Sequence, residues 1–145
     1  MTKFKSVDSR GIVMGRLGYG CDLLEELTNV CKQSGIRLGK VEAIGAVRKA
    51  CIGFYNQETR EYQFHNINHP LEIVSLKGNV SLKDGEPFVH AHATLADDAG
   101  KTVGGHLAPG TVVFACEFSL EAFDGPTFNR CLDEETGLPL WSLSE

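Results

Sequence analysis

One short segment of the chain has helical periodicity, while most of the remainder alternates in the manner of β-strands. Between residues 21 and 31 the apolar side chains recur at positions 23, 24, 27, 30 and 31, which places them on one face of a helix. Asp22 with Glu25 predicts a capping box at the start of this helix, and Gly35 predicts its end. From Val41 to Phe123 the runs are strand-like and are separated by turn residues. The pattern predicts an α/β domain of the α+β type: a mostly antiparallel sheet with one main amphipathic helix.

Short connections such as Asp84-Gly85 require neighbouring strands to pair antiparallel. In the last run, even-numbered residues from Val112 to Ala122, Phe114 among them, should form one apolar face. The tail 124–145 should pack on the sheet as an irregular segment or a short helix. The strands are expected at residues 12–17, 41–44, 47–55, 61–65, 71–82, 88–95, 102–107 and 111–123.

The length of 145 residues, without linkers or repeats, predicts a single domain over 1–145 that can form a core without disulfides or a structural metal. One helix covers only part of one face of a large sheet, so another apolar surface remains to be buried. Self-association is the simplest way to bury it.

Charge and cysteine content narrow the classes of function. The chain has 14 basic and 19 acidic residues and a net charge of −5, which disfavours a domain that grips the phosphates of nucleic acid. Five cysteines without a C-x-x-C pair are expected to be reduced and mostly buried. Because no signal peptide or membrane-length apolar run is found, a cytoplasmic protein without membrane contact is expected.

Three histidines are the strongest candidates for a functional site. His90 and His92 lie two residues apart on a predicted strand and therefore point to the same face. A three-residue loop, 98–100, with Gly100 in the left-handed position, predicts that His92 lies opposite His106 on the next strand. Three neutral imidazoles on a rigid sheet suit Zn²⁺ or a similar divalent ion and leave a coordination position open. A two-residue loop would instead turn His106 away.

The histidines also have an ordinary interpretation, as hydrogen-bonded structural side chains, because an H-x-H pair alone is a weak motif. His65 and His69 are expected at the surface or at an interface, with a further ligand role left open. Gly104 and Gly105 would let another backbone, a subunit or a ligand approach the sheet beside the site.

Two charged residues in apolar runs need partners. Glu72 and Arg16 could pair with each other, and either could bind a small anion or orient a histidine; an exposed edge position or a structural ion pair is the alternative. Glu42 and Glu117 are weaker examples of the same kind. The common hydrolase, NTPase and dinucleotide-binding motifs are not found in the sequence.

Several ordered motifs between residues 8 and 123 resemble the PPC domain, the "plants and prokaryotes conserved" family. The chain is similar to its prokaryotic single-domain members, which are related to the domain of the plant AT-hook nuclear-localized proteins. The motifs are Arg16-Leu17, Gly20-x-Asp22, Ile44-Gly45-Ala46, Tyr62, the segment 70–79, Pro87-Phe88-x-His90-x-His92 and Gly104-Gly105-His106-Leu107.

The resemblance implies a compact, mostly antiparallel domain that assembles as a homotrimer. In the plant proteins DNA affinity resides in the AT-hook, whose Arg-Gly-Arg-Pro core is not found in this sequence. Plant members also tend to have Ser in place of His106 and lack the H-x-H pair. The sequence therefore favours a homotrimer that binds a divalent metal, with zinc as the expected ion, and a small-molecule ligand as a further partner. DNA binding and metal-dependent catalysis on a small molecule remain the alternatives.

Overall fold

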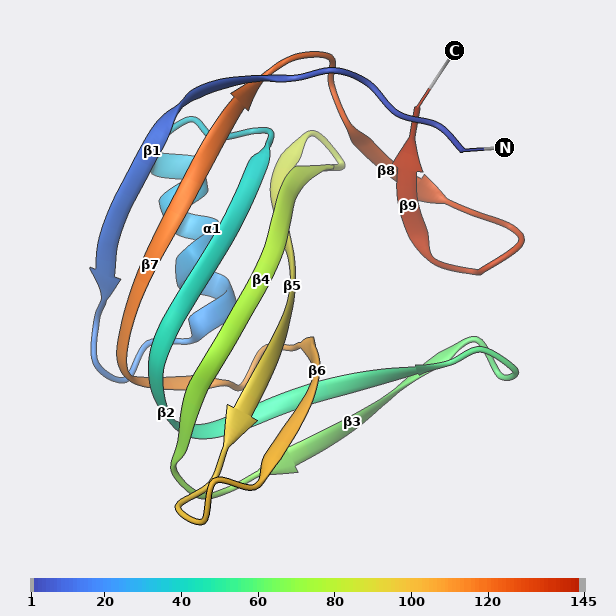
Figure 1. The fold of residues 1–145 in the computed structure, drawn as a ribbon. Coiled ribbons are helices and arrows are strands. Elements are labelled where there is room, and N and C mark those ends of the chain that lie inside the picture. Colours follow the sequence, from blue (N-terminus) through green and yellow to red (C-terminus); the bar gives the residue numbers. More distant parts are fainter. Residues whose placement is uncertain (1, 144–145) are drawn as a thin grey trace.

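The computed structural model describes residues 2–143 and contains, in that range, one helix and nine strands in a single strongly curved sheet (Figure 1). The helix α1 spans Leu23–Gln33. The strands are β1 (Asp8–Leu17), β2 (Gly39–Asn56), β3 (Glu61–Ile67), β4 (Leu71–Lys83), β5 (Glu86–Ala96), β6 (Thr102–Leu107), β7 (Val112–Asp124), β8 (Asn129–Leu132) and β9 (Pro139–Ser142).

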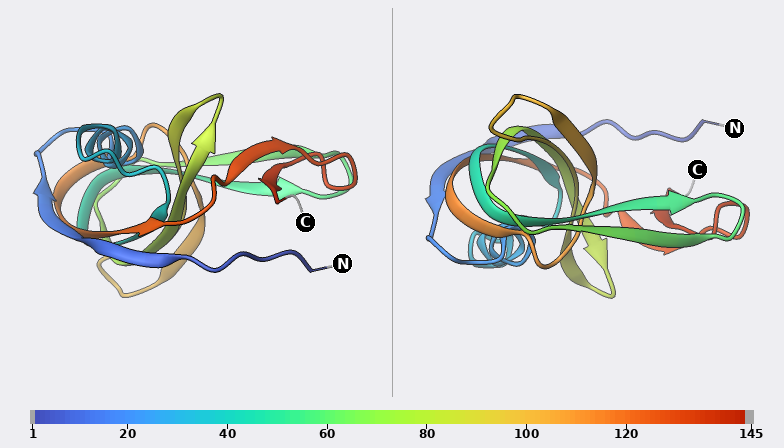
Figure 2. Two further views of the ribbon diagram at one scale, coloured as in Figure 1. Left: turned by 90° about the horizontal axis from the view of Figure 1, so that it is seen from above. Right: turned by 90° about the horizontal axis from the view of Figure 1, so that it is seen from below.

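Strand β2 organises the sheet because its two halves have different neighbours. Residues 39–47 of β2 pair with β4 on one side and β7 on the other, whereas its second half pairs with β3 and, at Ile52 and Gly53, with β6. Since β5 pairs with both β4 and β6, the pairings return to β2 and the sheet bends round on itself, as the end-on views in Figure 2 show. The predicted strands 41–44 and 47–55 are thus one bent strand.

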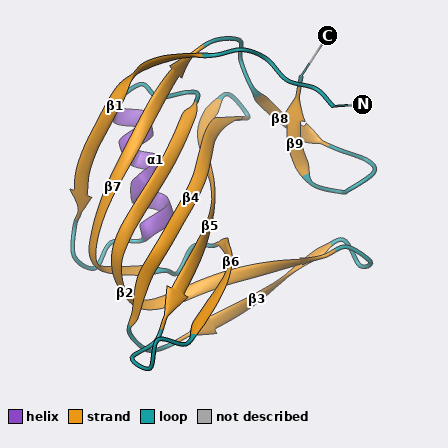
Figure 3. Ribbon diagram, in the orientation of Figure 1, coloured by secondary structure: helices purple, strands orange, loops and turns teal. Residues whose placement is uncertain are grey.

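The helix forms where its pattern predicted and covers one face of the sheet (Figure 3). The Asp22 carboxylate accepts hydrogen bonds from the backbone N–H groups of Leu24 and Glu25, which satisfies the first turn. Gly35, with φ of 64°, follows the last turn. Leu23, Leu27 and Cys31 are buried against the sheet and form the core with alternate strand residues such as Val41 and Leu76. No helix within residues 2–143 is long and apolar enough to cross a membrane.

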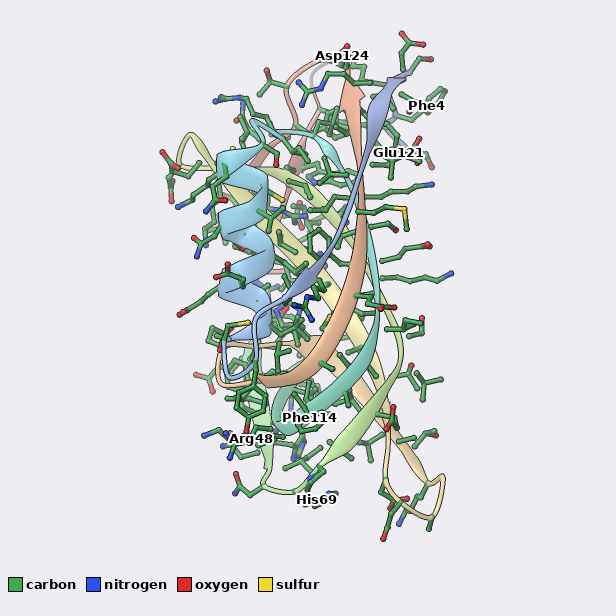
Figure 4. All side chains as sticks on the ribbon, turned by 90° about the vertical axis from the view of Figure 1, so that its left-hand side faces the viewer. Phe4, Arg48, His69, Phe114, Glu121 and Asp124 are labelled. Atoms are coloured by element: carbon green, nitrogen blue, oxygen red, sulfur yellow. The ribbon has the colours of Figure 1, made fainter. Side chains whose placement is uncertain are left out.

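The opposite face of the sheet is not covered by the helix. Figure 4 shows α1 on one side and side chains such as Glu121 projecting from the other. We call this uncovered side, which carries Met14, Glu42, Ile44 and Lys77, the open face. Met14 is 77% exposed and Ile44 58% exposed, so large apolar side chains lie here in water among charged ones.

The prediction that Phe114 belongs to the apolar face of β7 was wrong. Cys116, Phe118, Leu120 and Ala122 are buried as expected, but Val113 is fully buried and Phe114 is 58% exposed. The register between β2 and β7 shifts between Ala46 and Val47, and such an irregularity moves the next side chain to the other face. Phe114 instead packs edge-on against Tyr19.

The tail was also predicted incorrectly, because it is neither a helix nor irregular over its whole length. Strands β8 and β9 form a hairpin, and Asn129 pairs in parallel with Leu82 of β4. The tip of this hairpin touches the tip of the β2–β3 hairpin. The Tyr55 hydroxyl donates to the Thr136 carbonyl at 2.7 Å, and Arg60 donates to the carbonyls of Glu134 and Glu135. Two arms of the chain therefore meet beyond the end of the sheet.

The cysteines are reduced, as the sequence predicted. All five are free thiols; three are buried, and Cys131 is exposed. Burial raises the pKa of Cys31 and of Cys116 to about 11, which keeps both as inert thiols at neutral pH.

Candidate metal centre

The predicted turn between β5 and β6 is present and fixes the register of the two strands. Ala96 pairs with Thr102, and the loop at 98–100 places Gly100 at φ of 75°. The Asp97 carboxylate accepts hydrogen bonds from the backbone N–H groups of Ala99 and Lys101, which holds the loop. His92 consequently lies directly opposite His106, as expected from the loop length.

The three imidazoles of His90, His92 and His106 converge on the open face. Their candidate ligand nitrogens all lie within 4.8 Å of one another. The Nε2 atoms of His90 and His92 are 3.2 Å apart, and the ring centroids of the three pairs are 5.1 to 5.6 Å apart. Alternation along β5 explains the direction: Val89, Ala91 and Ala93 are buried on the helix side, so the histidines project away from it.

The surroundings keep the imidazoles of His90 and His106 neutral. Burial, followed by the neighbouring charges of His106, Arg130 and His92, lowers the pKa of His90 to about 4. Burial and the charge of His92 also lower the pKa of His106. Neutral imidazole is the form that binds a metal ion.

One buried atom of the group has no internal partner. Among the described residues, His106 Nδ1 is the single buried side-chain nitrogen or oxygen without a hydrogen bond. His90 Nε2 lies 3.2 Å from another imidazole nitrogen, His92 Nε2, so either one of the two nitrogens carries a proton or both lone pairs can face a cation. The three convergent imidazoles, with an unpartnered ring nitrogen on His106, therefore fit a divalent cation.

Aromatic side chains of the β2–β3 hairpin flank the histidines. The ring of Tyr62 lies 4.8 Å from that of His106, stacks on Phe64 and contacts Tyr55. Burial raises the pKa of Tyr62, so its hydroxyl stays protonated at neutral pH. Tyr62 is one of the residues that carry the resemblance to the PPC domain. Its position beside the histidines depends on the pairing of Gly53 with His106, so local sequence patterns could not predict it.

Gly104 and Gly105 allow a close approach of backbones, but the approaching strands belong to the same chain. A Cβ at Gly104 would lie 2.9 Å from the Ala93 carbonyl oxygen, and one at Gly105 would lie 2.7 Å from that of Gly53. These glycines let β6 fit between β5 and β2, which explains their presence without a ligand.

The predicted Arg16–Glu72 pair does not form. Arg16 lies on β1 and Glu72 on β4, with β7 and β2 between them. Three strand spacings correspond to about 14 Å, which is too far for an ion pair. Both side chains are exposed, and Arg16 lies directly opposite Glu117 in register. Neither residue belongs to the histidine group.

The remaining histidines also lie outside the group. His65 is exposed on β3, and His69 is exposed with its Nδ1 3.1 Å from the carbonyl of Pro70. Within the described residues, His90, His92 and His106 form the one cluster with metal-ligand geometry.

Arg130 was missed by the sequence analysis. It lies on β8 and donates to Asn79 Oδ1 at 2.7 Å, while Asn79 is directly opposite His90. The β8 segment shows no strand alternation long enough to recognise, and its parallel pairing with β4 depends on residues 47 positions away, Leu82 and Asn129.

Comparison with solved structures finds similar proteins over almost the entire chain. A metal-containing protein from Archaeoglobus fulgidus is 42% identical, with 98% of this chain and 100% of that chain covered and a TM-score of 0.93. A plant- and prokaryote-conserved (PPC) protein from Pyrococcus horikoshii is 35% identical, with 99% of each chain covered and a TM-score of 0.92.

A curated relative shares the domain within a much longer protein. The bifunctional protein GlmU of Synechococcus sp. (strain JA-2-3B'a(2-13)) is 35% identical over 124 residues. The match covers 84% of this chain and 18% of that protein, so the chain corresponds to a small part of its length. The model of the Plants and Prokaryotes Conserved (PCC) domain matches residues 5–124. The chain therefore belongs to the Plants and Prokaryotes Conserved domain family, as its motifs predicted.

Proposed function

We propose that this protein is a cytoplasmic homotrimer that binds one zinc ion per chain through His90, His92 and His106. The convergence of three imidazoles, with their ligand nitrogens within 4.8 Å of one another, carries the proposal. The unsatisfied Nδ1 of His106 and the lowered pKa of His90 support it, since both leave the group ready to accept a cation without first losing protons. The similar protein from Archaeoglobus fulgidus is described as metal-containing.

Three imidazoles are the donor set of zinc sites that keep a position free for water or a ligand. When bound at such a site, zinc supplies Lewis acidity and lowers the pKa of water to about 7. The chain's own residues hold the donors in place through the β5–β6 register, and Tyr62 covers one side of His106. This arrangement supports binding of a small ligand, and metal-dependent catalysis stands as the secondary possibility from the same open position.

Metal analysis of wild-type protein and His92→Ala, both purified without a metal-affinity tag, tests the site. We expect about one ion per wild-type chain and a loss of affinity of at least about a hundredfold in the variant, because removal of a ligand costs more than removal of its supporting hydrogen bond. His65→Ala, a substitution of an exposed histidine on β3, is the matched control and should keep the ion. Equal metal content in His92→Ala and wild type would refute the proposal.

The homotrimer rests on the family resemblance and on the open face. Met14 and Ile44, both on the open face, are each more than half exposed, which is unusual for large apolar side chains on strands of one sheet. A second and third copy of the chain would remove them from water. DNA binding ranks lower, because the net charge of −5 opposes contact with phosphates.

A further inference from the structure

Arg130 is held rigidly beside the histidines. Its Nε donates to Ser81 Oγ at 2.9 Å, and its terminal nitrogens donate to Asn79 Oδ1 at 2.7 Å and to the Pro139 carbonyl at 3.0 Å. The guanidinium also lies 5.2 Å from the ring centroid of Phe88 and 5.8 Å from that of Trp141. Three hydrogen bonds and two aromatic rings fix its orientation before any ligand arrives.

The contacts of Arg130 lie on the strip of sheet that carries the histidines. Asn79 is directly opposite His90, and Ser81 is directly opposite Phe88. Directly opposed residues have Cβ atoms about 4.5–5.5 Å apart on the same face. The guanidinium bonded to Asn79 is therefore a close neighbour of the imidazole of His90.

The charges of this region do not balance once a divalent cation is added. Histidine binds a metal ion as neutral imidazole and adds no charge of its own, and the hydrogen-bond acceptors of Arg130 are an amide, a hydroxyl and a carbonyl. Lys77, opposite His92, already forms an ion pair: its Nζ lies 3.9 Å from Glu42 Oε1. Among the described residues, no carboxylate forms an ion pair with Arg130.

The guanidinium retains donors for a ligand. Arginine has five N–H groups, and three are used in the contacts above, which leaves one on each terminal nitrogen. N–H donors of a guanidinium bind the oxygens of a carboxylate or phosphate well. A ligand that binds both the guanidinium and the cation must itself be negatively charged.

We propose that Arg130 and the ion at His90, His92 and His106 together bind a small oxyanion, which takes the open coordination position. This inference rests on the proposed metal site and adds the chemical class of its ligand. Tyr62, on the other side of His106, forms the adjacent wall.

Anion titration of zinc-loaded protein tests the proposal. Metal content is measured first, so that failure of the metal site shows up separately from failure of the anion site. Inorganic phosphate and acetate are then titrated by calorimetry into wild type, Arg130→Gln and the control Arg37→Gln, in which an exposed arginine outside the site is replaced. Phosphate and acetate distinguish a tetrahedral from a planar oxyanion.

Wild type and Arg37→Gln should bind at least one of the two anions, only when zinc is present. Arg130→Gln should keep its zinc and bind that anion about tenfold to a hundredfold more weakly, the loss expected for a charge-assisted hydrogen bond. Equal anion affinity in Arg130→Gln and wild type, or no binding of either anion by zinc-loaded wild type, would overturn the proposal.

A measurement on the wild type covers the case in which Arg130→Gln does not fold. The Nε–H signal of Arg130 in a proton–nitrogen NMR spectrum, assigned with Arg130→Lys, should shift when the bound anion is added to the zinc-loaded protein. The signal of Arg37 should not move. A static Arg130 signal at saturating anion would contradict the inference.

Discussion

At the scale of single residues, burial decides the protonation state of His90. The imidazole of His90 resists protonation in the folded protein, because burial lowers its pKa to about 4. In the unfolded chain the same residue has a pKa of about 6.5. Between these values the unfolded chain binds more protons than the folded one, so acidification favours unfolding.

Metal-free protein should therefore lose stability as the pH falls from about 6.5 to about 4, and His90 should contribute little further change below that range. The melting temperature of chelator-treated protein across this range measures the effect. His90→Gln should show a smaller slope, while His69→Gln, at an exposed position, should keep the wild-type slope. A slope in His90→Gln as steep as in wild type would contradict this account.

At the scale of elements, the site depends on one loop. The histidine cluster requires that β5 and β6 be joined through three residues, because side chains alternate between faces along each strand. A shift by one residue would place His106 on the helix side, in contact with the core.

Deletion of Ala99 should remove metal binding as completely as His106→Ala does, because a two-residue loop changes the register. Ala99→Gly keeps the loop length and should keep the ion. Metal analysis of the three variants, with circular dichroism as a check of folding, decides the matter. Retention of the ion by a folded deletion variant would show that the loop does not set the register.

The parts of the protein that could be predicted from the sequence are those that, like this loop, depend on residues close together in the chain. The helix, the strand β6 and the opposition of His92 to His106 follow from signals within a few residues: a capping Asp22, a glycine at a left-handed position and strand alternation. The exposure of Phe114 arises from an irregular pairing with β2, and the place of Arg130 arises from pairing with β4. Both depend on partners far away in the chain, for which local periodicity holds no information.

At the scale of the whole molecule, the uncovered apolar side chains predict assembly. Ile44 lies on the central strand β2, in the middle of the open face and 58% exposed. A carboxylate at this position would have to be buried without a partner on association, at a cost of several kcal/mol.

Light scattering on the eluting protein should give three times the chain mass of 15.8 kDa for wild type and the chain mass itself for Ile44→Glu. Leu132→Glu replaces an exposed leucine on β8, which among the described residues pairs only with β4 and β9 and not with the strands that carry Met14 and Ile44, and it should leave the mass unchanged. A wild-type monomer, or an Ile44→Glu variant that stays trimeric, would contradict assembly through this face.

The match to the family's model ends at residue 124, six positions before the arginine that lies beside His90. The imidazoles and the guanidinium thus come from different parts of the chain. Exchange of the final hairpin between related proteins would place a different side chain beside the histidine cluster and would thereby change the ligand that the cluster prefers. The strands that carry the histidines would stay unchanged.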